Sequence, residues 1–428
     1  MTDNDYRPRV IDTLLSRKLR SKGAVLIEGA KWCGKTSTAE QQAKSVIYMA
    51  EPKRREQYQL FADTHPEMIL AGETPRLIDE WQLTPKLWDQ IRFEVDHRKG
   101  MGQFILTGSS VPAKREEIVH TGTGRFAWLT MRPMSLWESG DSNGKISLGE
   151  LFASPETIAA TSDVDLRRIA YLTCRGGWPQ AALMSDDEEI ALDQAYDYYD
   201  AVVNSDIQRV DGVERDPERV KRLMRSYARY QGSQSSFAEI CKDMVANEQS
   251  GLDDNTISSY LNALRQIFVV EDMRAWNPNL RSKTVIRSTD NRYFVDPSIA
   301  TAALGLGPND LLNDLETFGL LFETLCVRDL RVFSQVLDGE VYHYRDKTGL
   351  ECDAVVHLRN GSYGLIEIKL GGNKLIEEGA KTLIALASKI DTTKMKNPAF
   401  LMILTATGSF AYRREDGVYV VPVGCLKD

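Results

Sequence analysis

The chain has 428 residues with 53 basic and 61 acidic side chains, which gives a net charge of −8 when histidine is neutral. Hydrophobic residues make up 42% and charged residues 27%, a composition that excludes collagenous, mucin-like and wholly disordered proteins. The length predicts about three domains, and no apolar run of the sequence approaches the ~20 residues that cross a bilayer. The acidic balance disfavours a protein that coats nucleic acid over its whole surface, but is compatible with a local basic patch.

Cysteine and histidine give no sign of a metal or disulfide framework. The five histidines contain no H-E-x-x-H pattern and the six cysteines no C-x-x-C pair, so we expect no zinc site. Scattered cysteines are typical of a reducing compartment, and the polar N-terminus MTDNDYRPRV is unlike a secretory signal. We therefore expect a cytoplasmic protein with no membrane partner. The cysteines are Cys33, Cys174, Cys241, Cys326, Cys352 and Cys425.

Residues 24–135 alternate five short apolar runs with helix-like stretches. The runs are AVLIEG, SVIYMA, PRLIDE, QFILTGS and RFAWLTM. Continuous apolar strands separated by helical patterns are typical of a parallel sheet that helices cover on both faces. The sequence therefore predicts an α/β fold for this part of the chain. We expect the Gly-, Ser- and Asp-rich segment 138–163 to be a connection and 305–310 (GLGPND) to be a linker.

The segment GAKWCGKTS contains the pattern G-x-x-x-x-G-K-[ST] of a phosphate-binding P-loop. Its glycines allow backbone N–H groups to point at phosphate oxygens, and the following helix adds its positive N-terminal end. We expect Lys35 to bind the β/γ-phosphates of ATP and the Thr36 hydroxyl to ligate Mg²⁺. An apolar strand before the loop favours this interpretation over a glycine-rich turn with a surface lysine. The predicted nucleotide-binding residues are Gly29, Ala30, Lys31, Trp32, Cys33, Gly34, Lys35, Thr36 and Ser37.

Two acids, Asp79 and Glu80, end the apolar run PRLIDE. A buried strand that ends in two acids is costly unless the acids bind something. In a P-loop protein the first acid holds the Mg²⁺ shell and the second polarises the attacking water as a general base. We therefore assign Asp79 to the metal and Glu80 to catalysis. The alternative, a pair of solvated acids at a strand end, is disfavoured by their spacing from the P-loop.

Polar residues also end the run QFILTGSS. If this strand lies between the two strands described above, Ser109 or Thr107 would lie beside the γ-phosphate and orient the water; the alternative is a simple capping turn. Arg125 follows Gly122-Thr123-Gly124 just before the next strand. An arginine at this point could reach the γ-phosphate of a neighbouring subunit as a finger in a homo-oligomer, or form a structural ion pair.

The whole chain resembles the bacterial and archaeal AAA+ ATPases of the ORC/STAND-like type that carry a C-terminal nuclease-like domain of unknown function. Ala30 stands where the family often has proline, and Ser109 or Thr107 matches the family's sensor position. The resemblance implies an ATPase domain over 1–140, a helical lid over 164–214, a winged helix over 215–300 and a PD-(D/E)XK nuclease-like domain over 311–428. It supplies no substrate. The segments that carry it are GAKWCGKTS, LIDEWQ, FILTGSS, HTGTGRFAWLTMRPMSLWESG, YLNALRQIFVVEDMRAWNPNLRSKT, YFVDPSIATAALG and the ECDAVV…LIEIKL pair.

The stretches FAEICKDM and DNTISSYLNALRQIFVV indicate two successive helices of a winged helix-turn-helix, with Asp254 or Asn255 capping the second. Two basic patches favour contact with DNA, whereas Asp253 and Asp254 at the start of the would-be recognition helix would repel phosphates. The patches and wing could hold the DNA backbone, or the module could pack against protein. The patches are Arg219, Lys221, Arg222, Arg225 and Arg229, and in the wing Arg281, Lys283 and Arg287.

From residue 315 onward the pattern predicts helix, three strands, helix and strand, the αβββαβ order of the PD-(D/E)XK nuclease fold. In GLIEIKL, Glu367 and Lys369 share one strand face because side chains alternate, and we expect Asp353 on the neighbouring strand. Two carboxylates on adjacent strands can hold Mg²⁺, and a lysine beside them can activate water or stabilise developing charge. Glu323, in an apolar helix, is the candidate for a further ligand.

Two functions are therefore open. In the first, the nucleotide state of the ATPase controls a DNA-directed nuclease. In the second, the chain is an ATP-dependent switch that binds DNA or a partner protein, and the C-terminal domain keeps its acids for structure and docks without cutting.

Overall fold

The computed structural model describes residues 6–110, 121–184, 187–248, 251, 253–278 and 289–428. The chain divides into two compact units. The first unit comprises Met1–Arg132, Asn204–Arg215 and Asn262–Val269, and the second comprises Pro133–Val203, Asp216–Leu261 and Val270–Asp428. Within the described ranges, no helix is both long and apolar enough to cross a membrane.

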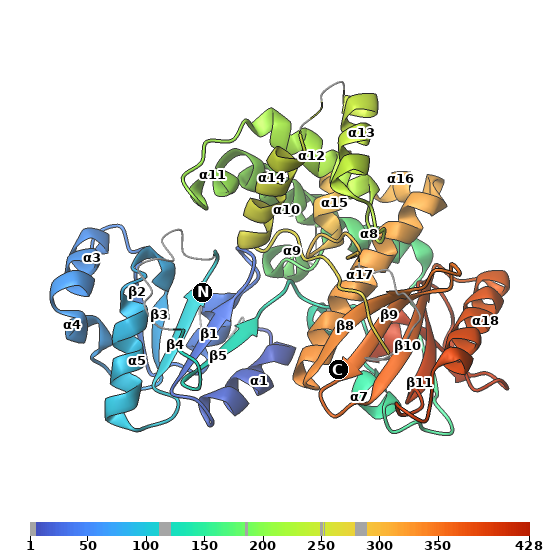
Figure 1. Cartoon of the computed structure of the whole chain (residues 1–428), viewed down its shortest axis with the longest axis horizontal. Helices are drawn as coiled ribbons and strands as arrows, with labels where there is room; N and C mark the ends of the chain where they lie inside the picture. The colour runs from blue at the N-terminus through green and yellow to red at the C-terminus, as the bar shows by residue number, and fades with distance from the viewer. Residues whose placement is uncertain (1–5, 111–120, 185–186, 249–250, 252, 279–288) are drawn as a thin grey trace. The chain divides into compact units, whose positions relative to one another are not determined.

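A five-stranded parallel sheet forms the centre of the first unit (Figure 1). Its order is β2-β3-β4-β1-β5, so β4 lies between β1 and β3. The predicted parallel sheet is confirmed, and so is the central place of the strand QFILTGS. The strands are β1 (Ala24–Glu28), β2 (Ser45–Tyr48), β3 (Arg76–Asp79), β4 (Phe104–Gly108) and β5 (Phe126–Thr130).

Helices cover the sheet because its central strands are apolar along their whole length. Leu26, Ile78 and Leu106 are almost fully buried and pack with Trp88 of α5 and Ile69 of α4 in one cluster. Burial of each such side chain contributes roughly 1.5–3 kcal/mol. The helices of this part are α1 (Val10–Leu19), α2 (Lys35–Glu40), α3 (Arg55–Thr64), α4 (Pro66–Leu70) and α5 (Leu87–Arg98), with a 3-10 turn η1 (Trp81–Leu83).

Helices dominate residues 166–313, as the periodicity predicts. One cap differs from expectation: α14 begins at Asp254 and Asp253 caps it, because its carboxylate accepts the backbone N–H of Thr256 at 3.0 Å. The supposed linker at 305–310 contains the start of a helix, α16, at Pro308. The helices are α8 (Leu166–Arg175), α9 (Pro179–Leu183), α10 (Glu188–Ala201), α11 (Ile207–Arg209), α12 (Pro217–Arg229), α13 (Phe237–Glu248), α14 (Asp254–Gln266), α15 (Pro297–Leu304) and α16 (Pro308–Asn313), with a π turn η3 (Val202–Asp206).

Two antiparallel bridges follow α14, one joining Val270 to Phe294 and the other joining Met273 to Asn291. They bring together the two arms of the region where a wing is predicted. The predicted wing cations Arg281, Lys283 and Arg287 lie outside the described residues.

The C-terminal sheet has seven strands in the order β7-β12-β13-β11-β10-β9-β8. Strands β8, β9 and β10 are antiparallel, and β10 pairs in parallel with β11 after the crossover helix α18. The predicted helix–three strands–helix–strand order is confirmed, while β12 and β13 were not anticipated. The elements are α17 (Leu315–Val336), β8 (Gly339–Arg345), β9 (Glu351–Leu358), β10 (Tyr363–Lys369), α18 (Asn373–Lys389), β11 (Phe400–Thr405), β12 (Phe410–Arg413), β13 (Tyr419–Pro422), η4 (Val423–Cys425) and β14 (Leu426–Lys427).

The segment 138–163 is more than the connection expected from its composition. Its strand β7 (Ala160–Thr161) pairs with β12 at the edge of the C-terminal sheet, and β6 (Ile146–Ser147) pairs with β14. Two short helices, α6 (Leu136–Ser139) and α7 (Leu148–Leu151), complete the segment. These partners are far away in sequence, so local composition could not indicate them.

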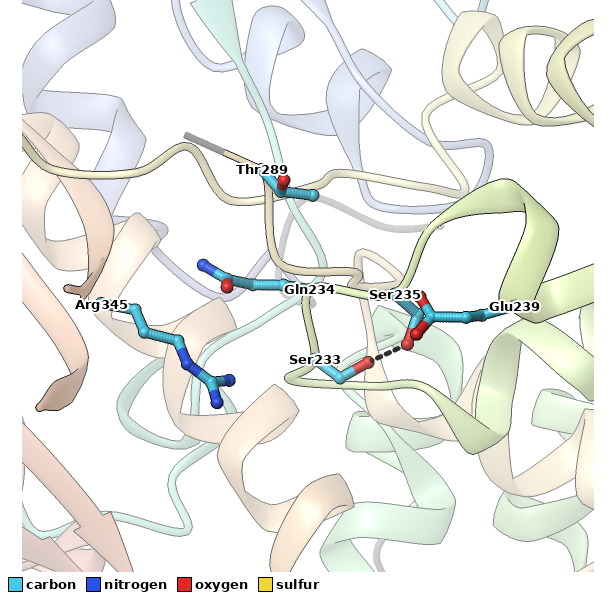
Figure 2. Close-up of a pocket in the computed structure, with 6 residues that line it drawn as sticks. All are labelled: Ser233, Gln234, Ser235, Glu239, Thr289 and Arg345. Carbon is cyan, nitrogen blue, oxygen red and sulfur yellow. Dashed lines mark hydrogen bonds between the residues drawn. The ribbon is translucent and has the colours of Figure 1, made fainter. Parts of the chain in front are cut away.

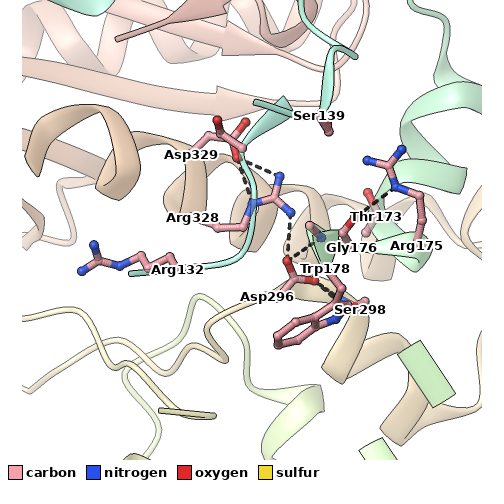
Figure 3. A network of polar contacts seen from close by, with 12 residues as sticks. Arg132, Ser139, Thr173, Arg175, Gly176, Trp178, Asp296, Ser298, Arg328 and Asp329 are labelled. Carbon is pink, nitrogen blue, oxygen red and sulfur yellow. Dashed lines mark hydrogen bonds and ion pairs between the residues drawn. The ribbon is translucent and has the colours of Figure 1, made fainter. Parts of the chain in front are cut away.

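A buried ionic network holds four distant segments of the second unit together (Figure 3). Arg328 of α17 donates to Asp296 at 2.9 Å and to Asp329 at 2.7 Å. Asp329 also accepts the backbone N–H of Leu136 at 3.0 Å, and Asp296 accepts that of Gly177 at 2.9 Å. Because a buried charge without a partner is strongly destabilising, this network fixes the chain around residue 136 onto α17.

His343 of β8 is a second buried titratable group of this unit. It is 2% exposed and its Nε2 lies 3.0 Å from the carbonyl of Thr289, a contact in which the neutral ring donates. Burial lowers the pKa of His343 from 6.5 to about 4. The unfolded chain therefore binds more protons between these values, so stability falls as pH drops through this window.

We expect the unfolding free energy to decrease from pH 7 to pH 4, by up to about 1.4 kcal/mol per pH unit for this one proton. His343→Gln should flatten this dependence, while the control His65→Gln, at an exposed position, should leave it unchanged. Urea unfolding at a series of pH values measures both slopes. Equal slopes for wild type and His343→Gln would contradict the assignment.

Candidate functional site

The P-loop connects β1 to α2 at the carboxyl edge of the parallel sheet. Gly29 has φ 153°, and a Cβ at this position would lie 2.0 Å from the carbonyl oxygen of Met131. Only glycine fits this close approach of two backbones. Glycine therefore allows the chain to turn at this point. The turn places the backbone N–H groups of the loop at the start of α2, where an anion binds favourably.

Lys35 is the first residue of α2 and is 6% exposed. Its ammonium donates to the carbonyl oxygens of Gly29 at 2.9 Å and Ala30 at 2.7 Å. These bonds hold the ammonium group inside the loop. Phosphate oxygens bound by the loop would replace the two carbonyl oxygens as acceptors of its hydrogen bonds. The prediction that Lys35 belongs to a phosphate cradle is consistent with this geometry.

Asp79, at the end of β3, joins the adjacent strand β4 to the P-loop. Its Oδ1 atom accepts the hydroxyl of Thr36 at 2.7 Å and that of Thr107 at 2.6 Å. It is 8% exposed. A carboxylate and a hydroxyl at this distance are the hard oxygen donors that Mg²⁺ takes in proteins, so the side chains present fit the predicted metal assignment of Thr36 and Asp79.

Glu80 follows β3 in the left-handed region, with φ 56°. Its Oε2 accepts the hydroxyl of Ser109 at 3.1 Å and is also bonded to the amide of Gln82. The structure thus brings together the predicted base and the predicted sensor residue from adjacent strands. Gln82 was missed by the sequence analysis, although it lies in the motif LIDEWQ.

The N-terminal helix region supports the P-loop from outside it. Arg9 is 6% exposed and donates to the carbonyl oxygens of Cys33 at 2.7 Å and Arg132 at 2.9 Å. The Tyr6 hydroxyl lies 2.9 Å from the hydroxyl of Thr38 on α2, and burial raises the pKa of this tyrosine. No sequence motif marks these residues, because their partners are separated from them in the chain.

Lys31 of the P-loop forms an ion pair with Asp206 at 2.5 Å. Asp206 belongs to the segment 204–215 that clusters with the first unit. The helical region that was predicted as a lid therefore contributes an acid directly to the loop.

Arg125 lies at the opposite edge of the sheet from the P-loop. It directly precedes β5, which runs parallel to β1, and its backbone carbonyl accepts the N–H of Gly23 at 3.1 Å. Strands of five residues separate the two edges by roughly 15 Å. The side chain pairs with Asp96 at 2.6 Å. Within its own subunit Arg125 is thus a structural ion-pair residue, and any finger role requires a neighbour.

The basic patch on α12 is largely paired with acids. Lys221 and Arg225, for example, are each 3.4 Å from a glutamate oxygen. Exposed ion pairs contribute little to stability, but they reduce the local positive charge on which a DNA contact would depend. The pairs are Arg219–Asp216, Lys221–Glu218, Arg225–Glu248, Arg229–Asp243 and Arg229–Glu248.

A second polar cluster lies where β9 and β10 separate. The register shifts within β8 and β9, since Tyr342 pairs with Val355 but Tyr344 pairs with Cys352. This bulge contains Asp353, and bulges next to functional sites re-aim side chains. Its Oδ2 accepts the backbone N–H of Ile368 at 2.7 Å, beyond the last ladder pair of the two strands.

Lys369 connects the two predicted acidic ligands. Its ammonium is 3.0 Å from Asp353 and 2.7 Å from Glu367. Burial alone would lower the pKa of Lys369, but the two carboxylates outweigh it and raise that pKa. Burial also raises the pKa of Glu367 to about 8. Its second oxygen, Oε1, is buried and has no hydrogen-bond partner within the described structure, so it has capacity for a further ligand.

Glu323 of α17 faces the same cluster. Burial, followed by the charge of Asp353, raises its pKa well above the usual range. The buried Tyr293 donates a hydrogen bond to Glu323, and a Cβ on Gly232 would lie 2.9 Å from its Oε1. Even so, the described residues contain no group of three or more side chains arranged to hold a metal ion. The predicted acids are therefore neighbours, and Lys369 stands between two of them.

Family models match three successive parts of the chain. Residues 21–139 match the AAA domain. Together with the P-loop and the strand order, this match decides the fold of the first part. Residues 21–139 have the AAA+ P-loop fold. In the rest of the chain, residues 166–310 and 318–426 match two domains of unknown function, DUF8612 and DUF4143.

Two curated relatives from mycobacteria are similar in sequence to most of this chain. They are an uncharacterized protein of Mycobacterium bovis and one of Mycobacterium tuberculosis. Each is 24% identical over 357 residues, which covers 83% of this chain and 72% of the relative.

Several solved structures are similar to this chain. The Walker-type ATPase of Pyrococcus abyssi is 14% identical, with 70% of this chain and 97% of that chain covered and a TM-score of 0.43. The ORC2 protein of Aeropyrum pernix is 13% identical, with 63% and 90% covered and a TM-score of 0.32. DnaA of Aquifex aeolicus is 13% identical, with 60% and 86% covered and a TM-score of 0.26.

Proposed function

We propose that the AAA+ domain binds and hydrolyses ATP. The observation that carries this proposal is the convergence of Asp79 and Glu80 on the P-loop edge, where Asp79 bonds the hydroxyl of Thr36 at 2.7 Å. Lys35 and the loop N–H groups bind the phosphates. Mg²⁺, held by Thr36 and Asp79, supplies charge neutralisation when bound.

Glu80 acts as the general base in this proposal. Its carboxylate accepts hydrogen bonds from Ser109 and Gln82, which fix its orientation for a water molecule beside the γ-phosphate. Proton transfer from this water to Glu80 accompanies the attack on phosphorus, and ADP leaves. Ser109 and Gln82 are positioning residues, because they act through Glu80.

Substitution of Arg125 distinguishes ATP hydrolysis within a single subunit from ATP hydrolysis at a site formed between two subunits. Because it lies at the far edge of its own sheet, Arg125→Ala should leave ATP affinity unchanged within about twofold. In an assembled oligomer the same substitution should lower turnover by about 10³-fold or more, if Arg125 reaches a neighbour. Mixing Lys35→Ala with Arg125→Ala subunits measures this, since activity recovers only where sites form between chains. Full activity of Arg125→Ala alone would remove the finger role.

We further propose that nucleotide state controls the C-terminal domain. The support is the short path from the end of β5. Met131 donates its N–H to Glu28 at 2.7 Å, whereas Met134, three residues on, donates to Gly177 at 2.6 Å. Leu136 is in turn fixed to Asp329 of α17, the helix that also carries Glu323. Only a short stretch of chain therefore connects the P-loop edge to the segment that is fixed on α17, and a movement of that edge would be transmitted to α17.

The proposed activity of this domain is Mg²⁺-dependent cleavage of DNA at Asp353, Glu367 and Lys369. The unpartnered Oε1 of Glu367 and the element order of the PD-(D/E)XK fold support it. The test is incubation of linear, nicked and single-stranded DNA with Mg²⁺, with and without ATP. Absence of cleavage under every condition would contradict nuclease activity and favour the second function described next.

The second function is an ATP-dependent switch in which this domain docks without cutting. It is favoured by the ion pairs of Lys369 with both carboxylates, because the ammonium supplies positive charge to both acids without a metal. In this case Glu367→Ala would fold and keep partner binding. Loss of all function in a folded Glu367→Ala protein would contradict docking.

A further inference from the structure

A polar cavity of about 470 Å³ lies in the second unit, and no motif of the sequence points to it. Figure 2 shows the Arg345 guanidinium and the Gln234 amide extending toward the same space. The size is that of sites for small molecules, and is too small for a nucleic-acid duplex. The lining residues are Ser233, Gln234, Ser235, Glu239, Thr289 and Arg345.

Hydroxyl, amide and guanidinium donors dominate this cavity. The Ser233 hydroxyl donates to the carbonyl of Tyr230 at 2.8 Å and lies 2.8 Å from the Ser235 hydroxyl, and the Ser235 hydroxyl can rotate to donate to a ligand. The Nε atom of Arg345 is buried without a hydrogen-bond partner within the described structure. A planar fork of donors on Arg345 matches phosphate geometry.

Two acids near the cavity are already engaged. The carboxylate of Glu239 accepts the backbone N–H of Ser236 at 2.7 Å and its hydroxyl at 2.9 Å, so it caps α13. Glu351 lies 3.4 Å from one terminal nitrogen of Arg345, and this pair leaves the other terminal nitrogen of the guanidinium as a donor. The groups of the cavity that can bind an anion are the Arg345 guanidinium and the Ser235 hydroxyl.

The cavity adjoins the acidic cluster of the C-terminal domain. The loop that supplies Ser233 and Ser235 begins at Gly232, which packs directly against Glu323. On the other side, Arg345 pairs in register with Glu351 on β9, and Asp353 is two residues further along that strand. Two residues of a strand span about 7 Å, the order of the spacing between neighbouring phosphates in an extended nucleic-acid strand.

We propose that this cavity binds a backbone phosphate of a single nucleic-acid strand, next to the phosphate presented to Asp353, Glu367 and Lys369. The inference rests on the proposed function of that cluster, and makes the middle of the chain part of the substrate site. Ser233 and Gln234 come from the loop before α13, whereas Arg345 comes from β8. A bound nucleic-acid strand would therefore contact both the loop and the C-terminal sheet.

The test is fluorescence anisotropy of a labelled single-stranded DNA oligonucleotide in EDTA, where Mg²⁺-dependent cleavage cannot occur. Arg345→Gln should weaken binding about tenfold or more, and lower the slope of log affinity against log salt by about 0.7. The matched control is Arg359→Gln, since Arg359 is exposed near the other end of β9. Gln234→Glu provides a second variant on a different element, and should also weaken binding because it adds a negative charge. Thermal melts verify that each variant is folded.

The outcomes separate this inference from the proposed function. Weakened binding in folded Arg345→Gln and Gln234→Glu, with Arg359→Gln at wild-type affinity, supports the cavity even if no DNA is ever cleaved. Cleavage by wild type together with unchanged binding in both cavity variants overturns the cavity and leaves the nuclease. Inorganic phosphate that binds at millimolar concentration without any oligonucleotide binding overturns the nucleic-acid ligand.

Discussion

Replacing Glu80 with glutamine is expected to slow ATP turnover by about 100-fold or more while ATP affinity stays close to that of wild type. A general base contributes 10²–10⁴-fold in typical enzymes, and glutamine keeps the size of the side chain without its basicity. The hydrogen bonds that Ser109 and Gln82 donate to Glu80 can partly persist with a glutamine oxygen. Steady-state phosphate release and equilibrium binding of a fluorescent ATP analogue measure the two quantities separately.

Two further variants make this result specific. Lys35→Ala should lose ATP binding as well as turnover, because its ammonium is the charge inside the loop. Glu56→Gln, at an exposed position of α3, should change neither. Turnover of Glu80→Gln equal to that of wild type would show that another group takes the proton, and would leave Glu80 as a positioning residue.

The residues at the P-loop edge of the sheet could be predicted because the sequence patterns that mark them are local. Apolar runs fix where the strands begin and end, and in a parallel sheet the carboxyl ends of neighbouring strands share one edge. Thr36, Asp79 and Thr107 therefore had to come close once the strand order was correct. Arg9 and Gln82 were not predictable in this way, because an arginine before a helix or a glutamine after an acid has no distinctive pattern.

The acidic cluster of the C-terminal domain shows a different limit of prediction from the sequence. Alternation along β10 correctly places Glu367 and Lys369 on one face, but the position of Asp353 depends on a bulge that alternation does not indicate. Burial likewise depends on distant residues. The raised pKa of Glu323 arises from a helix covered by Tyr293 and Gly232, which are remote from it in sequence. Sequence identified the ionisable groups, whereas tertiary packing decides their charge.

Removing Lys369 is the second change with a large expected effect, and it separates catalysis from structure. Lys369→Met leaves Asp353 and the 3%-exposed Glu367 without their cation. Breaking a buried ion pair from one side costs about 3–5 kcal/mol, so the single variant should unfold at lower urea. It should also lose any DNA cleavage by about 100-fold or more, but that loss alone would not distinguish the two roles.

The double variant Glu367→Gln/Lys369→Met resolves this ambiguity. It also replaces the Glu367 carboxyl, which would otherwise lack its cation, by an uncharged amide of similar volume, so most of the lost stability should return. If the cluster cuts DNA, this stable protein has no Mg²⁺-dependent cleavage, since both the ligand and the cation are gone. If the cluster serves structure alone, the same protein keeps ATP-dependent binding of its partner. Urea unfolding, cleavage and oligonucleotide binding on the same preparations therefore decide between the two functions, because stability recovers in both cases and activity in only one.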